Sequence, residues 1–480
     1  MKHFFIRKPV KLIQAETERS ELQRSLSAAN LVSLGIGCII GAGIFVMTGQ
    51  AAAQYAGPAI MISFVIAGLC CAFAGLCYAE LASMLPVSGS AYSYAYASLG
   101  EVVAWIMGAL LLLEYGVASS TVAVGWSGYV ASFLEGTMGI VIPEHLRTAT
   151  ISMTENHELV FNNSFNLPAF LGILIVTLLL VKGVKESATV NNVIVAIKVA
   201  VILLFIAAGA FYVNPDNWHP FIPEPDGDRY GWNGIARAAG VVFFAYVGFE
   251  AVSTAAQEAK NPQRDMPIGI IGSLIVCTIL YMMVSAVLTG IVPYTILDVP
   301  DPMAVAVDAI GLDWLAFLVK VGAIAGLSSV MMVLLYGQTR IFFTMSRDGL
   351  LPPAFHKVHP KFKTPYINTL VVGVIVAFVA ASTPIGILGD LVSLGTLTAF
   401  TIICFTVLYL RRKEPELERP FRAPGGALTP LLGMAFCGYL IASLLSNPIT
   451  VQFYVIYFVV ALMVYLVYGS RKSKLRHGHD

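Results

Sequence analysis

Long apolar stretches alternate with short polar segments along nearly the whole chain. Twelve of these stretches are apolar enough, and mostly long enough, to cross the roughly 30 Å of hydrocarbon in a bilayer. The predicted spans are 29–53, 58–84, 100–133, 168–184, 190–212, 232–257, 266–292, 314–345, 366–382, 387–410, 428–446 and 451–469. The pattern therefore predicts an all-α polytopic membrane protein with twelve transmembrane helices.

Two of these stretches are interrupted where a membrane helix should continue. The first holds four glycines in the nine residues 35–43 (GIGCIIGAG), and each glycine costs a helix about 1 kcal/mol relative to alanine. The second is interrupted within 243–250 (FFAYVGFE). Non-helical backbone survives in a bilayer only where it is buried in protein or lines a cavity. Paired interruptions are typical of transporter binding sites, so the chain is predicted to carry a small polar molecule.

The order of the spans predicts an internal repeat. The interruptions fall in spans 1 and 6, so each repeat would contain five spans. Because five is an odd number, the second repeat would have the opposite orientation in the membrane. We therefore expect two inverted halves of five helices each, 29–212 and 232–410, followed by two further helices in 428–469. The tails 1–28 and 470–480 lie outside this core.

Composition and charge support a membrane protein and predict its orientation. The chain is 57% hydrophobic and 12% charged, whereas a soluble domain carries about twice that charge. Of its 29 Lys and Arg residues, 24 lie on the side of the amino terminus, and the opposite loops hold only Arg147 and Arg229. Because basic residues gather on the cytoplasmic side, both termini are predicted to be cytoplasmic, in the plasma membrane.

The interruptions supply candidate ligand-binding groups from the main chain. A break near Gly41 would expose N–H groups at a helix start, which favour an anion, and a break near Tyr246 would free carbonyl groups, which favour a cation. Such an arrangement suits a zwitterion, most simply an α-amino acid. The alternative is that Gly37 and Gly41 only allow close helix packing, which leaves the second interruption unexplained. The candidate substrate-binding residues are Ile40, Gly41, Ala42, Gly43, Ile44, Phe244, Ala245, Tyr246 and Val247.

Three ionisable residues lie well inside predicted spans, where such residues are costly and usually functional. Burial favours the neutral form of a lysine, so Lys198 could exchange a proton and replace a sodium ion. Glu114 is a candidate substrate ligand, counter-charge or proton carrier, and Glu250 could couple occupancy to closure of span 6. The alternative for each is a static buried ion pair. Arg237 and Lys320 lie near span ends, so their charged ends are expected to reach the membrane interface.

Other polar and aromatic residues carry weaker signals. The aromatic residues at the second interruption could form a gate or simply pack; they are Phe243, Phe244, Tyr246 and Phe249. Ser328 and Ser329 could help to line a cavity, and Glu80 is expected to anchor the cytoplasmic end of span 2. No nucleotide-binding loop, metal-ligand spacing or catalytic triad pattern is visible. We therefore expect no enzyme activity, no cofactor, no metal and no nucleic acid partner.

Three segments carry a family resemblance. They are GIGCIIGAGIF (35–45), FFAYVGFEAVSTAAQEAKNPQRDMP (243–267) and YGQTRIFFTMSRDGLLP (336–352). They resemble the amino acid–polyamine–organocation superfamily, and within it the cationic amino acid transporter family and its bacterial homologues. The resemblance covers about residues 25 to 470 and implies the leucine-transporter-type fold, with two inverted five-helix repeats and discontinuous first and sixth helices.

The resemblance also implies roles for particular residues. The substrate carboxylate would meet the main chain of 41–44, and its ammonium group the carbonyls of Phe244, Ala245 and Val247. Lys198 aligns with a lysine that replaces a sodium site in proton-coupled relatives, and Glu114 would lie near the pocket. Some family members bind a small membrane accessory subunit, although no residue here indicates one. We thus expect a secondary amino acid transporter driven by protons, with an amino acid or polyamine exchanger as the alternative.

Overall fold

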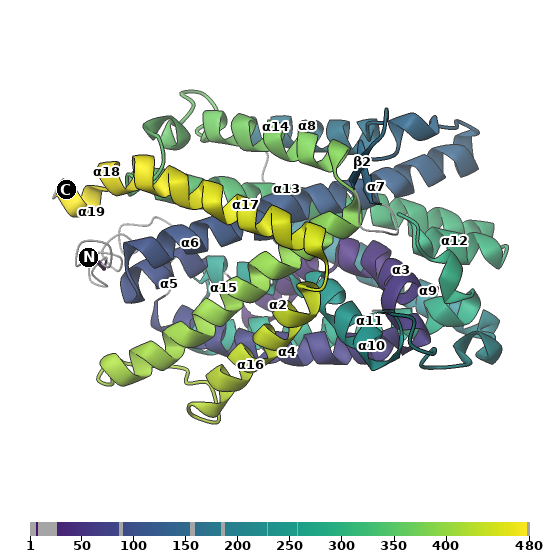
Figure 1. Cartoon of the computed structure of the whole chain (residues 1–480), viewed down its shortest axis with the longest axis horizontal. Helices are drawn as coiled ribbons and strands as arrows, with labels where there is room; N and C mark the ends of the chain where they lie inside the picture. Colours follow the sequence, from purple (N-terminus) through teal and green to yellow (C-terminus); the bar gives the residue numbers. More distant parts are fainter. Residues whose placement is uncertain are drawn as a thin grey trace.

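The computed structural model describes residues 6–7, 26–85, 90–153, 159–183, 188–227, 229–256 and 258–477. Most of the predicted amino-terminal tail, 1–28, and the last three residues of the carboxy-terminal tail lie outside the described residues. The described chain is mostly helical, with long helices that run roughly along one common direction (Figure 1). This arrangement agrees with a polytopic membrane protein.

The helices follow the apolar stretches of the sequence. In the first half they are α2 (Ala28–Ile39), α3 (Thr48–Ala51), α4 (Ile60–Met84), α5 (Ser90–Ser98), α6 (Glu101–Leu111), α7 (Ala118–Phe133), α8 (Leu167–Val181) and α9 (Ala188–Gly209). In the second half they are α10 (Gly231–Val242), α11 (Pro262–Ile291), α12 (Pro302–Ala309), α13 (Asp313–Arg347), α14 (Tyr366–Ser382) and α15 (Ile385–Lys413). The chain ends with α16 (Leu428–Leu444), α17 (Pro448–Val464), α18 (Ser470–Lys472) and α19 (Lys474–His477).

Short segments of wider or tighter helix extend or join these elements. The π-helical segments are Gly43–Met47, Ala52–Ala56, Leu112–Val117, Leu134–Met138 and Tyr465–Gly469. The 3₁₀ segments are Gly57–Ala59, Glu144–Leu146, Ala210–Tyr212, Pro215–Trp218, Phe243–Tyr246, Phe249–Ala255, Tyr294–Ile296 and Pro353–His356. Because π-bulges and 3₁₀ stretches inside helices often occur at functional sites, those in the interrupted spans mark a candidate site.

Within the described residues, eight continuous helical stretches are long and apolar enough to cross a membrane. These are Gly43–Met84, Glu101–Met138, Asn192–Tyr212, Gly231–Ser253, Pro262–Ile291, Asp313–Arg347, Ile385–Lys413 and Pro448–Lys472. Four shorter apolar helices, α2, α8, α14 and α16, accompany them. Every predicted span coincides with one or more of these helices, and the predicted span 366–382 has the bounds of α14.

Side-chain caps and prolines fix several helix starts. The Asn166 side chain accepts a hydrogen bond from the Ala169 N–H at 3.1 Å, and Pro168 occupies the first turn of α8. Asn447 caps α17 in the same way through the Ile449 N–H at 3.2 Å. Both starts were predicted within a few residues because the apolar run that follows each of them is a local signal.

The polar connections contain elements that the apolar pattern did not predict. A hairpin of β1 (Ile151–Met153) and β2 (Leu159–Phe161) pairs antiparallel, with Ile151 opposite Phe161. Figure 1 places β2 and α12 toward one end of the long axis and α5, α18 and α19 at the other. These ends agree with the sides to which the charge pattern assigned the same loops.

Three charged residues near span ends form hydrogen bonds or ion pairs with specific groups. Glu80 accepts hydrogen bonds from Arg411 and from the Ala423 N–H at 2.8 Å, which ties α4 to the end of α15, as expected of an anchor. Lys320, also expected to reach the interface, is itself buried, and its Nζ lies 2.9 Å from the half-exposed Asp308 of α12. The expectation for Arg237 was wrong: its side chain is buried, because an acidic partner inside the protein, Asp390, pairs with the guanidinium there.

Candidate functional site at the interrupted helices

The first interruption lies at Ile40 and Gly41. Helix α2 ends at Ile39, Ile40 adopts an extended conformation with φ −71° and ψ 97°, and helical structure resumes around Ala42. The π-helical segment Gly43–Met47 follows directly. The residues around the break are all buried, so the non-helical backbone is enclosed by protein, as a bilayer requires.

The second interruption lies at Val247 and Gly248. Helix α10 narrows into the 3₁₀ segment Phe243–Tyr246, and the chain then turns at Val247 with ψ 131°. Gly248 has φ 118°, a conformation that other residues rarely adopt, before a second 3₁₀ segment begins at Phe249. This break lies one to two residues beyond the predicted position at Tyr246.

The two interruptions contact each other directly. A side chain at Gly43 would overlap the main chain of Ala245, and one at Gly248 would lie 2.8 Å from the Cys38 carbonyl oxygen. Both glycines therefore allow the backbones of the two broken helices to approach closely. The glycines of the first segment thus serve close packing as well as helix interruption, and the two roles are compatible.

Lys198 of α9 binds the end of α2. Its buried Nζ donates to the carbonyl oxygens of Gly37 at 3.0 Å and Ile40 at 3.2 Å. In an unbroken helix the Ile40 carbonyl would accept from the Ile44 N–H, four residues later. The ammonium group takes this acceptor instead, which places a positive charge where the helix carries its partial negative charge.

Tyr281 of α11 joins the two interruptions, and sequence reasoning missed it. Its buried hydroxyl lies 2.7 Å from the Ala245 carbonyl oxygen and 3.0 Å from that of Ile39, so both carbonyls compete for one proton. The Ile39 carbonyl is the acceptor that Gly43 N–H would have in an unbroken helix. No local signal distinguishes Tyr281 from other tyrosines in apolar helices, since its role depends on segments far away in the chain.

The carbonyl groups of the second interruption are less free than predicted. The Phe244 oxygen accepts from the Val247 N–H at 3.1 Å, and the Ala245 oxygen accepts from Tyr281. These bonds form because the 3₁₀ turn brings Val247 back toward Phe244 and α11 packs alongside. Each carbonyl keeps a second lone pair for a ligand.

Glu114 and Glu250 lie next to each other, although the sequence separates them widely. Both side chains are fully buried and their carboxyl groups interact. Glu250 accepts from the Gly248 N–H at 3.0 Å, which fixes it at the second interruption. Among the described residues, neither oxygen of Glu114 has a hydrogen-bond partner other than the neighbouring carboxyl group of Glu250. A buried, incompletely paired carboxyl pair is a strong candidate for proton or cation binding.

The aromatic residues at the second interruption pack against neighbouring helices. Phe243 and Phe249 contact the ring of Phe400 in α15, with centroids 5.5 and 5.1 Å apart. The Tyr246 hydroxyl donates to the Phe64 carbonyl oxygen at 2.9 Å. These contacts favour the packing interpretation for the three residues, and they fix the second interruption between α4 and α15.

Comparison with known proteins identifies the family of this chain. The sequence model of the family described as "Amino acid permease" matches residues 26–467. The chain belongs to the amino acid permease family. This confirms the predicted amino acid–polyamine–organocation superfamily, and the permease is a membrane-embedded, multi-pass transporter rather than an enzyme.

Several curated relatives resemble the permease along nearly its whole length. It is 48% identical to a "Methylthioribose transporter" of Bacillus subtilis, over 99% of this chain and 100% of the relative. It is 47% identical to the "Branched-chain amino acid permease BcaP" of the same organism, over 97% of each. It is also 39% identical to "Cationic amino acid transporter 4, vacuolar" of Arabidopsis thaliana, over 82% of this chain and 64% of that relative.

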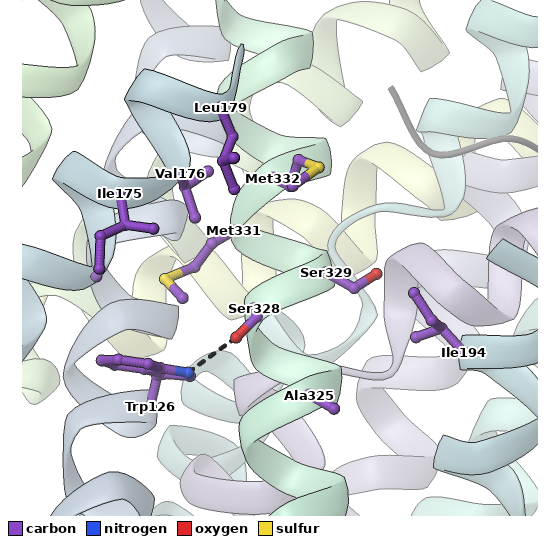
Figure 2. A pocket seen from close by; sticks show the side chains of 11 residues that line it. Trp126, Ile175, Val176, Leu179, Ile194, Ala325, Ser328, Ser329, Met331 and Met332 are labelled. Carbon is purple, nitrogen blue, oxygen red and sulfur yellow. Dashed lines mark hydrogen bonds between the residues drawn. The ribbon is translucent and has the colours of Figure 1, made fainter. Parts of the chain in front are cut away.

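The permease also has a pocket that is lined by residues outside the two interrupted helices (Figure 2). Its volume is about 280 Å³, and α7, α8, α9 and α13 contribute its mainly apolar lining. Ser328 and Ser329 lie there, and Ser328 accepts a hydrogen bond from Trp126 at 2.9 Å. The two serines do line a cavity, but an apolar one that lacks the charged groups a zwitterion needs.

Proposed function

We propose that this permease is a secondary active transporter that carries an amino acid across the plasma membrane together with protons. The observation that carries the proposal is the contact between the two interrupted helices, where helix-start N–H groups and turn carbonyls lie side by side. Such groups neutralise the two charges of a zwitterion without committing any side chain. Substrate binding would bias closure of the broken helices over it, which drives alternating access.

The substrate carboxylate is proposed to bind the N–H groups of residues 41–44. Support comes from the carbonyl groups that would accept hydrogen bonds from these N–H groups in an unbroken helix. Because α2 ends at Ile39, the break separates the N–H groups of Gly43 and Ile44 from the carbonyls of Ile39 and Ile40, their ordinary helical acceptors. Those carbonyls accept from Tyr281 and Lys198 instead. The substrate ammonium is proposed to bind the carbonyls of Phe244, Ala245 and Val247, and Ile40 and Tyr246 complete the candidate site. Glu114 is proposed to lie at the edge of this site.

Proton coupling is proposed to depend on Lys198 and the Glu114–Glu250 pair. If all three groups were ionised, this buried region would carry one excess negative charge, which is costly in a low-dielectric interior. A proton shared by the two carboxyl groups would remove that excess. The positive charge of Lys198 at the end of α2 takes the place that a sodium ion would otherwise fill, which disfavours sodium coupling.

The topology is proposed to comprise twelve membrane crossings. Residues 29–212 and 232–410 would form inverted halves, residues 428–469 two further helices, and both termini would be cytoplasmic. The strong excess of basic residues on one side supports this orientation. The placement of α12 and α5 at opposite ends of the molecule agrees with it.

The substrate and driving force can be tested by uptake of labelled compounds into liposomes that contain the purified protein. Three conditions are compared: an inward proton gradient, an inward sodium gradient and no gradient. Accumulation driven only by protons is the expected result. Accumulation driven by sodium would contradict the role of Lys198, whereas gradient-independent exchange would indicate an antiporter.

The panel should contain branched-chain, cationic and small neutral amino acids, and methylthioribose. The relative named as a methylthioribose transporter provides a specific second candidate, because this neutral thio-sugar lacks the two charges of a zwitterion. Uptake of methylthioribose without any amino acid would contradict the proposed substrate class.

A further inference from the structure

A buried ion pair connects the outer half of the second interrupted helix to its surroundings. Arg237 of α10 donates from Nη2 to Asp390 of α15 at 2.6 Å, and the two side chains are only 5% and 4% exposed. The Arg237 guanidinium also lies 5.3 Å from the ring centre of Tyr55. Helix α10 precedes the second break, and the segment that carries Tyr55 follows the first break. Through Arg237, which contacts both Asp390 and Tyr55, the two half-helices are joined to α15.

Asp390 also contacts polar groups other than Arg237. Its Oδ2 accepts from the Thr450 hydroxyl at 3.1 Å and lies 3.5 Å from Nδ2 of Asn447, both at the start of α17. Asn447 also caps α17 through the Ile449 N–H, so Asp390 is tied to the start of α17. Asp390 therefore has polar partners that remain if α10 moves away.

Arg237 likewise keeps a partner if the pair separates. The Tyr55 ring stabilises a guanidinium through its π face, and Tyr55 lies on the other interrupted helix. Arg237 Nη1 has no hydrogen-bond partner among the described residues, so the pair is not saturated. Removing one partner of a buried ion pair usually leaves an uncompensated charge. Here each charge retains a local partner, which makes reversible separation feasible.

We propose that Arg237 and Asp390 form an outer latch of the transport cycle. This inference rests on the proposed function, in which the interrupted helices move during alternating access. When closed, the pair holds α10 and the segment that carries Tyr55 against α15 and α17. When it separates, those half-helices are released and the substrate path opens on the side of the membrane that carries α12. Both residues act by positioning helices, since neither lies at the interruptions themselves.

The test uses the full-length protein in four forms: wild type, Asp390→Asn, Arg237→Lys and Lys320→Met. Asp390→Asn removes the charge while keeping the size, and Arg237→Lys is the conservative change. Lys320→Met is the matched control, because the Lys320–Asp308 pair joins α13 to α12 rather than to an interrupted helix.

Two properties are measured for each form. Hydrogen exchange of the amides in residues 231–242 and 366–382 reports the opening of α10 against the reference helix α14 and needs no substrate. Uptake of the best substrate in the liposome panel gives the maximal rate and KM.

For Asp390→Asn we expect exchange in 231–242 to accelerate about fivefold or more, with exchange in 366–382 unchanged. The maximal uptake rate should fall about fivefold or more, because the half-helices are no longer held closed by the latch. KM should change less, because the groups proposed to bind substrate are unchanged. Arg237→Lys should lie between Asp390→Asn and wild type, and Lys320→Met should match wild type.

Wild-type exchange and uptake in Asp390→Asn would overturn the latch. Equal acceleration in both segments would also overturn it, since the pair would then only support the fold. If Asp390→Asn does not fold, wild-type behaviour of Arg237→Lys in both measurements overturns it. If wild type transports no amino acid but 231–242 still responds selectively, the proposed function fails and the latch stands.

Discussion

Replacing Tyr281 by phenylalanine tests whether the link between the two interruptions matters for substrate binding. The change removes a single oxygen atom and keeps the ring, which packs against Phe64 and Tyr246 with centroids 5.2 and 5.4 Å away. The carbonyls of Ile39 and Ala245 then lose the hydroxyl that lies 3.0 and 2.7 Å from them. The two half-helices are no longer tied together at this point.

The cost follows from these contacts. A typical buried hydrogen bond contributes about 1 kcal/mol net, and a buried carbonyl left without a partner costs about 1–3 kcal/mol. Because one proton serves two acceptors, we count one bond and expect a total of about 1–3 kcal/mol. If binding requires the two breaks to be held in register, substrate affinity should fall roughly 5- to 150-fold.

Affinity can be measured by titration calorimetry with the amino acid that gives the highest uptake, and stability by the unfolding temperature. Tyr457→Phe is the matched control, because the Tyr457 hydroxyl donates to the Ala109 carbonyl oxygen at 2.7 Å, between α17 and α6. Both variants should lose similar stability, but only Tyr281→Phe should lose affinity. Wild-type affinity in Tyr281→Phe, with its stability lowered as in the control, would refute the reasoning.

Three further changes probe the site. Gly43→Val should abolish substrate binding, because its side chain would enter the space of the Ala245 main chain; normal affinity would refute the placement. Lys198→Ala should remove the pH dependence of transport, and an unchanged pH profile of uptake would assign Lys198 a structural role. Glu114→Gln should alter substrate range or proton coupling, whereas unchanged uptake kinetics across the panel would leave Glu114 with packing alone.

The sequence predicted the helices well because a membrane helix is specified by local information. A run of apolar residues of sufficient length favours a helix wherever it is placed in a bilayer, since the backbone must satisfy its own hydrogen bonds there. The span at 366–382 therefore has the same bounds as α14. Helix breaks were predicted for the same reason, since glycine clusters weaken a helix irrespective of its neighbours.

The short polar connections were harder to predict. Helices α5 and α12 and the β1–β2 hairpin lie in segments that the apolar pattern assigned to loops. These elements are too short to give a clear period, and their conformation depends on the segments that they pack against. The sequence signal for such elements is weak even when the structure is well defined.

Only the tertiary structure determined which groups the buried ionisable side chains contact. Sequence reasoning selected Lys198, Glu114 and Glu250 because ionisable residues are rare within apolar spans. It gave no means of knowing that the two carboxyl groups would meet, or that Lys198 would bind the end of α2. It also assigned Arg237 to the membrane interface, because a span-end position suggests an exposed charge unless the packing is known.

The apolar pattern thus determined which segments are helical, which two are broken and which residues are costly to bury. The fold determined that the breaks touch at Gly43 and Ala245, that Tyr281 bridges them and that Arg237 pairs with Asp390. The physical reason is one of range. Helix formation and interruption depend on neighbours a few residues away, whereas hydrogen bonds and ion pairs between helices depend on how segments hundreds of residues apart pack together.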